Sequence, residues 1–82
     1  MNPAIKNPAV YAAFHFKKNV PGYTVNLIEL DTPAEEGLVA LYLYRVLLDG
    51  KFIAEKKIAL FSDDCGDFVD LALAFLYKAA SK

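Results

Sequence analysis

An Asp-Gly pair between two long apolar runs constrains this chain more than any other feature. Asp49 and Gly50 separate residues 38–48 from residues 51–61, and both runs are rich in aliphatic and aromatic residues. Asp-Gly is favoured in two-residue hairpin turns of type I′, because both central residues of that turn need a positive φ. The sequence therefore predicts an antiparallel hairpin over residues 38–61.

The predicted turn also fixes which residues pair across the hairpin. With a two-residue turn, positions whose numbers add up to 99 face one another, so Leu41 would pair with Ile58. One face then carries a long series of apolar side chains, interrupted by Arg45 and Lys56. We expect this face to form the core, with Val39, Leu41, Leu43, Leu47, Phe52, Ala54, Ile58 and Leu60 on it.

A third strand is predicted over residues 23–30. It follows Pro21-Gly22, a pair that suits a type II turn because proline fixes φ and glycine accepts a positive φ. Residues 31–37 are polar and contain a proline, so we expect a loop there.

A fourth strand is predicted over residues 9–17, where apolar side chains recur with a period of two. A helix that begins at Pro8 behind an Asn7 cap is the alternative for this segment. Residues 1–8 are expected to be a loose lead-in. The predicted apolar side of the strand consists of Val10, Ala12, Phe14 and Phe16.

A C-terminal helix is predicted from a cap at Ser62 or Asp64 to about Ala80. Its apolar arc covers about 200°, whereas a helix on one sheet typically needs a little over about 100°. The arc is centred on Phe68, Ala72, Phe75, Leu76 and Ala79, and Val69, Leu71, Leu73 and Ala80 widen it. We therefore expect one α+β domain over residues 1–82, an antiparallel β-meander of about four strands with a C-terminal α-helix on one face (ββββα).

Composition indicates surfaces that need a partner. A chain of 82 residues that is 56% hydrophobic has more apolar surface than one small core covers. The net charge of −1 gives no general attraction to nucleic acid or to a membrane. Cys65 is the only cysteine and residues 1–19 show no secretory pattern, so we expect a cytoplasmic protein.

The hairpin face opposite the predicted core is expected to be an interaction surface. It would carry tyrosines, which bring apolar area together with a polar tip and are enriched in binding patches. An ordinary half-exposed sheet face is the alternative. The predicted surface comprises Tyr42, Tyr44, Ile53 and Lys57 of the hairpin with Tyr11 and His15 of the first segment.

An acidic patch at the start of the last helix consists of Asp63, Asp64, Asp67 and Asp70. These carboxylates suit a helix N-terminus, and they could also meet a basic partner. The spacing of a calcium loop is absent, and one cysteine with one histidine cannot complete a zinc site. We therefore predict no metal and no cofactor.

Catalysis is not expected from this sequence. Cys65 and His15 are a conceivable thiolate and base, but nothing in the spacing brings them together. Phosphate loops and nucleophile elbows are also absent. The favoured hypothesis is a non-enzymatic protein-interaction module, a homodimer or a complex subunit of adaptor or inhibitor type. A small ligand-binding or enzymatic domain is a further alternative.

Nucleic-acid binding through the tyrosines and the Lys17-Lys18 and Lys56-Lys57 pairs is the other alternative. If the first segment were helical, the order α-β-β-β-α would resemble that of double-stranded-RNA-binding domains. The resemblance is one of order alone. Ser62, Asp63 and Asp64 stand where that family has a lysine-rich helix start, so we expect phosphate to be repelled there.

Overall fold

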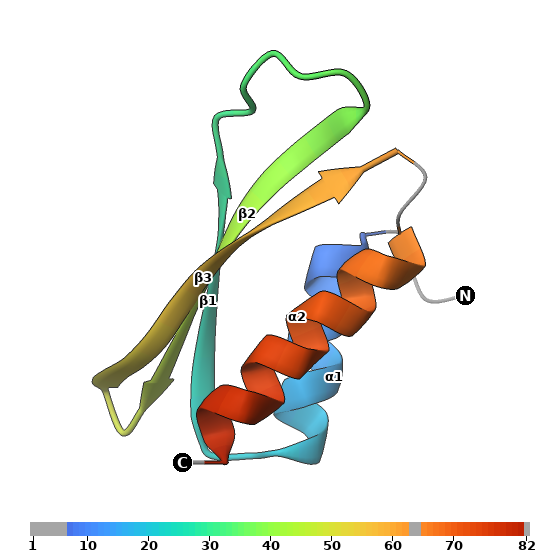
Figure 1. Ribbon diagram of the computed structural model, residues 1–82. Helices are drawn as coiled ribbons and strands as arrows, with labels where there is room; N and C mark the ends of the chain where they lie inside the picture. The colour runs from blue at the N-terminus through green and yellow to red at the C-terminus, as the bar shows by residue number, and fades with distance from the viewer. Residues whose placement is uncertain (1–6, 63–64, 82) are drawn as a thin grey trace.

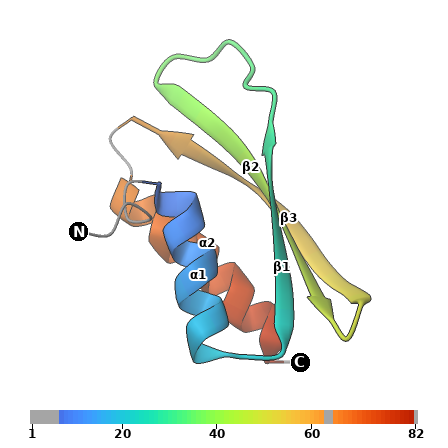
Figure 2. The same ribbon diagram turned by 180° about the vertical axis from the view of Figure 1, so that it is seen from behind.

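The computed structural model of the protein describes residues 7–62 and 65–81. It is an α+β structure with one antiparallel sheet, as predicted, but the sheet has three strands rather than four. Two helices, not one, lie together on the same face of that sheet (Figure 1, Figure 2). The elements in chain order are α1 (Pro8–Asn19), β1 (Tyr23–Leu30), β2 (Leu38–Leu48), β3 (Lys51–Phe61) and α2 (Cys65–Ala80), and the sheet order is β1-β2-β3.

The first segment is a helix, so the strand prediction for residues 9–17 is wrong. The Asn7 side chain caps the helix, with its Oδ1 accepting hydrogen bonds from the backbone N–H of Ala9 at 2.9 Å and Val10 at 3.4 Å. Pro8 at the first helical position fits this start, since its missing N–H would be unpaired there. The buried residues Ala9, Ala12 and Phe16 recur at helical spacing. Because alanines are small, the apolar pattern of this segment fits both the two-residue period of a strand and the spacing of a helix. The Asn7 cap favours the helix.

The hairpin turn is confirmed. Asp49 has φ 54° and Gly50 has φ 80°, the two positive values that a type I′ turn requires. Leu47 pairs with Phe52 as predicted, but Val46 pairs with Ala54, so Ile53 is an extra residue in β3. From the Val46–Ala54 pair to the Ala40–Leu60 pair the register differs by one residue from the predicted one, and a second shift at Val39 restores the predicted pairing of Leu38 with Phe61.

The bulge at Ile53 reverses the predicted faces of β2, because a one-residue slip moves side chains to the other face. The predicted pairing of Leu41 with Ile58 is wrong, since Leu41 pairs with Ala59 and Ile58 pairs with Tyr42. The predicted core positions on β3 are right for Ile58 and Leu60, which are buried, and for Ala54, which packs against the core. They are wrong for Val39, Leu41, Leu43, Leu47 and Phe52, and the buried residues of β2 are Ala40, Tyr42, Tyr44 and Val46.

The second helix has the predicted extent. Its cap was predicted at Ser62 or Asp64, and Asp64 lies outside the described residues. Four residues of the predicted arc are buried, namely Phe68, Ala72, Leu76 and Ala79. The arc is wide because α2 packs against α1 as well as against the sheet. Much of the predicted spare helix surface is therefore covered within the chain, although Leu71 remains 55% exposed.

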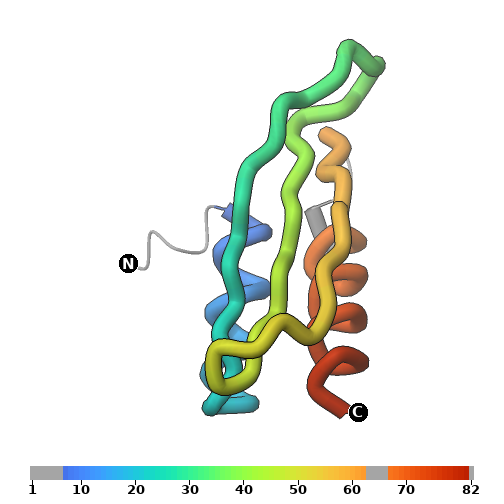
Figure 3. The backbone as a smooth tube through the Cα atoms, turned by 90° about the vertical axis from the view of Figure 1, so that its left-hand side faces the viewer, coloured from blue at the N-terminus to red at the C-terminus, as the bar shows by residue number. Residues whose placement is uncertain are grey.

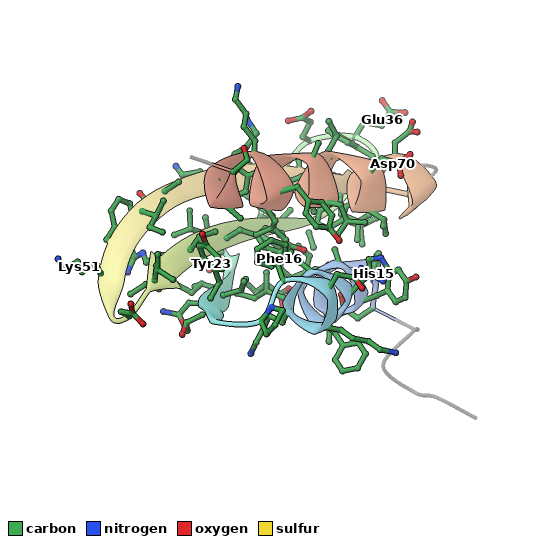
Figure 4. The ribbon with its side chains drawn as sticks, turned by 90° about the horizontal axis from the view of Figure 1, so that it is seen from below. His15, Phe16, Tyr23, Glu36, Lys51 and Asp70 are labelled. Carbon is green, nitrogen blue, oxygen red and sulfur yellow. The ribbon has the colours of Figure 1, made fainter. Side chains whose placement is uncertain are left out.

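Aromatic rings fill the space between the two helices and the sheet. Phe16 of α1 makes edge-to-face contacts with Tyr77 of α2 and Tyr23 of β1, with ring centroids 5.4 Å and 6.0 Å away. Figure 4 shows Phe16 and Tyr23 in this interior, whereas His15 lies on the outer side of α1. The Tyr23 hydroxyl donates a hydrogen bond to the carbonyl of Ala80 at 3.1 Å, which ties the end of α2 to the start of β1. The two helices thus close over one side of the sheet, and the end of α2 is tied to its edge strand β1.

Candidate interaction surface

The two hairpin tyrosines predicted at the surface lie in the core. Tyr44 is fully buried and Tyr42 is 7% exposed, both beneath the helices. The Tyr44 hydroxyl donates a 2.7 Å hydrogen bond to the Ala9 carbonyl, and the Asn7 amide lies 3.5 Å from the Tyr42 hydroxyl. Their predicted exposure is wrong because the bulge at Ile53 turns them inward.

Tyr44 is a structural donor rather than an acid. Burial raises the pKa of its hydroxyl far above the usual value, and the neighbouring Tyr42 raises it further. A neutral phenol that donates to a carbonyl satisfies a buried polar group, as the interior requires. The hydroxyl therefore anchors α1 to the centre of the sheet.

The remaining residues of the predicted surface divide between two places. Lys57 is exposed on the sheet face away from the helices, and Ile53 is the partly buried bulge residue. Tyr11 and His15 lie on α1, where their rings stack 5.8 Å apart at an interplanar angle of 20°. The structure therefore does not bring these residues together into the predicted surface.

Two residues that sequence reasoning missed complete the cluster around His15. The Asn19 amide lies 3.1 Å from His15 Nε2 and donates a 3.1 Å hydrogen bond to the Tyr77 hydroxyl. Tyr11, His15 and Asn19 recur every four residues along α1, a spacing that only a helix places in one row. This cluster links α1 to α2, and its geometry serves the packing of the helices.

The conceivable catalytic pair is described only in part, because the Cys65 side chain lies outside what the structure describes. The helices run in the same direction, and His15 reaches the end of α2 through Asn19 and Tyr77. Cys65 is the first residue of α2, and at 1.5 Å per residue it lies about 18 Å from Tyr77 along the helix axis.

The acidic patch is described only in part. Asp67 and Asp70 are exposed on the first turns of α2, and Asp63 and Asp64 lie outside the described residues. Within residues 7–62 and 65–81, no group of three or more histidine, cysteine, aspartate or glutamate side chains is placed to hold a metal ion. The described carboxylates are in the place where the helix dipole favours negative charge.

The face of the sheet that the helices leave uncovered carries apolar side chains on all three strands, and we call it the open sheet face. Figure 3 looks onto it, with all three strands in front of both helices. Side chains alternate across a sheet, so the positions between the buried ones of each strand belong to this face. Its apolar members are Ile28, Leu30, Leu41, Leu43, Leu47, Phe52 and Ala59, and its polar members are Thr24, Asn26, Arg45, Glu55 and Lys57.

Charge on the open sheet face is largely neutralised within the chain. Arg45 and Glu55 are cross-strand partners joined by a 3.1 Å salt bridge, and the Arg45 guanidinium lies 6.0 Å from the centre of the Phe52 ring. Phe52 is 58% exposed and Ile28 is 38% exposed, so large apolar side chains meet solvent on both sides of this pair. On this face the charges of Arg45 and Glu55 are thus paired within the chain, and Lys57 adds a positive charge.

Two concave regions flank the helices. A groove of about 650 Å³ between α1 and β1 is lined by Val10, Ala13, Phe14, Lys17, Lys18 and Val25. A hollow of about 270 Å³ between β3 and α2 is lined by Ala54, Glu55, Lys56, Phe75, Lys78 and Ala79. Both are open to solvent.

Comparison with family models, curated proteins and solved structures finds no significant match to the chain. The elements follow one another in the order α-β-β-β-α, which resembles that of double-stranded-RNA-binding domains. The resemblance is limited to this order. Neither helix in the described part of the chain has the length and apolar character that crossing a bilayer would take.

Proposed function

We propose that the protein is a non-enzymatic interaction module that binds a protein partner through the open sheet face. The observation that carries this proposal is the series of leucines on the outer side of β2, flanked by Ile28 and Phe52 at the surface. Contiguous exposed apolar patches usually mark an interface, because leaving them in water costs free energy. An adaptor or inhibitor in a reducing cytoplasm suits a chain with one cysteine.

The proposal keeps the interaction surface on the sheet face away from the helices but changes the residues of β2 that form it. Tyr42 and Tyr44 were expected to provide it, and their burial leaves the leucines Leu41 and Leu43 in that position. The nucleic-acid alternative relied on the same tyrosines as stacking platforms. Burial of Tyr42 and Tyr44 leaves only Tyr11 of its three tyrosines partly exposed, and acidic Asp67 and Asp70 at the start of α2 oppose phosphate binding.

A photo-crosslinking residue at position 43 tests the proposal, with the same residue at position 71 as control. Leu43 is on the open sheet face, and Leu71 is an exposed leucine on α2. We expect irradiation in cells to give protein adducts, identified by mass spectrometry, from position 43 and not from position 71. Adducts from position 71 alone would contradict the proposal.

A further inference from the structure

The free edge of β1 borders the groove between α1 and β1. Because the sheet order is β1-β2-β3, β1 has a strand on one side only within the described residues. Alternate residues of an edge strand turn their backbone N–H and C=O groups away from the sheet, where another strand can pair with them. We infer that this edge binds an extended segment of a partner protein, antiparallel to β1, in which alternate apolar side chains enter the groove and acidic residues follow them.

The groove offers the apolar contacts that an added strand needs beyond its backbone hydrogen bonds. Val10 and Phe14 of α1 line it together with Val25 of β1, and Phe14 is 57% exposed and Val10 40% exposed. The opposite flank of α1 faces α2 through the Asn19–Tyr77 hydrogen bond. The groove volume of about 650 Å³ is within the range of about 300–1,000 Å³ that is typical of ligand sites.

Charge along the groove sets the composition of the bound segment. Lys17 and Lys18 line the groove in the last turn of α1, the end that leads into β1. At the other end, Glu29 shares a row with Tyr42, whose hydroxyl lies beside the Asn7 cap of α1. A segment antiparallel to β1 therefore begins near Glu29 and ends near the lysines, and antiparallel pairing is slightly more stable per residue. Carboxylates in the C-terminal part of the segment then meet the two lysines.

The two lysines are available for this contact. Both are exposed, and among the described residues neither has a carboxylate within salt-bridge distance. The dipole of α1 also favours lysine in the last turn, but it does not account for the exposed Phe14 ring in the same groove. An apolar wall with a basic end matches an apolar segment that is followed by carboxylates.

A second copy of this chain does not fit the same edge. α1 packs against β1 and lies behind it in Figure 3. A copy paired through its own β1 would bring a second α1 to within about one strand spacing of 4.8 Å, whereas packed helices need about 8–10 Å between their axes. An extended segment without a helix of its own avoids this overlap.

A displayed library of random peptides of about ten residues, the length of a long strand, tests the inference. Selection on the wild-type protein should enrich sequences in which alternate apolar residues precede aspartate or glutamate. A selected peptide should bind about tenfold more weakly to Phe14→Ser and to the double variant Lys17→Glu/Lys18→Glu. Leu71→Ser and Lys78→Glu are the matched changes on α2, at an exposed leucine and at a lysine of the last turn, and they should leave the Kd unchanged.

The same selection separates this site from the open sheet face. Leu43→Glu, on that face, should bind the selected peptide like the wild type. Binding lost in Leu43→Glu and kept in Phe14→Ser would place the peptide on the open sheet face and overturn the inference. No enrichment, or enrichment of sequences that lack acidic residues or carry them before the apolar ones, would also overturn it.

A measurement on the wild-type chain shows how the peptide binds, without relying on any variant. Hydrogen exchange followed by NMR should become slower at amides on the free edge of β1 when the selected peptide is bound, because strand addition pairs them. Protection that is absent from β1, or that is confined to the opposite edge strand β3, would overturn the inference.

Discussion

The two faces of β2 are both apolar, yet only one is covered. Tyr42 and Tyr44 point towards the helices and are buried, whereas Leu41 and Leu43, their neighbours in the same strand, are partly exposed on the open sheet face. By hydrophobicity alone the leucines would be at least as suitable for the core. The difference indicates that the tyrosines suit the buried side because their hydroxyl groups find hydrogen-bonding partners there. These partners are Ala9 on α1 and Asn7, the residue that precedes α1.

The largest contrast between the faces should come from truncating adjacent residues. Tyr44→Ala removes a fully buried aromatic side chain, and we expect a loss of about 3–5 kcal/mol in unfolding free energy. Leu43→Ala, measured at a protein concentration where the chain is monomeric, should lower the unfolding free energy by about 1 kcal/mol. Urea denaturation of the pair measures both. Equal losses would mean that the two faces are equally buried.

Removing only the hydroxyl sharpens the comparison. Tyr44→Phe loses the donor of the 2.7 Å hydrogen bond to the Ala9 carbonyl, so we expect a loss of about 1 kcal/mol. Tyr42→Phe is the control, because its hydroxyl contact of 3.5 Å is longer. Denaturation should show the smaller loss for Tyr42→Phe, and the reverse order would contradict the role given to Tyr44.

The buried face should also be sensitive to alkali. Because burial raises the pKa of Tyr44 in the folded state, the folded protein holds its proton above about pH 10, where an unfolded tyrosine releases it. Its contribution to stability is present below that pH and is lost progressively as the pH rises further. Unfolding free energies at about pH 9 and about pH 11 measure the loss. It should be smaller in Tyr44→Phe, and an equal loss would contradict this origin.

The smallest effect is expected on the open sheet face. The Arg45 and Glu55 side chains are 41% and 44% exposed, and ion pairs of this kind contribute about 0–1 kcal/mol. Arg45→Gln and Glu55→Gln should therefore change the unfolding free energy little, and added salt should reduce the difference further. A loss comparable to that of Tyr44→Phe would show that this pair is shielded from water.

Local signals were enough to predict most element boundaries. The Asp49-Gly50 turn, the Pro21-Gly22 turn and the long apolar runs predicted all three strands of the sheet and the second helix. The first helix was named only as an alternative, because Ala12 and Ala13 fit the period of a strand as well as that of a helix. The Asn7 cap is the feature that distinguishes the two.

The candidate surface could not be predicted, because it depended on one residue of register. Nothing local marks Ile53 as unpaired, and the choice of face is made when the helices pack. The Asn19–Tyr77 hydrogen bond likewise joins residues 58 positions apart, a contact that no sequence spacing reveals.

The bulge at Ile53 has a consequence for how the chain folds. If Ile53 enters the ladder, β3 slides by one residue against β2, and the leucines of β2 share a side with Ile58 and Leu60. That slipped hairpin also has a mostly apolar side, interrupted by Arg45 and Lys56, and the same favourable turn, so we expect it to compete early in folding. Deletion of Ile53 would remove the competitor, since the native pairs would then be the ones that a flush two-residue turn specifies. One residue thus acts as a spacer that keeps the tyrosines, rather than the leucines, under the helices.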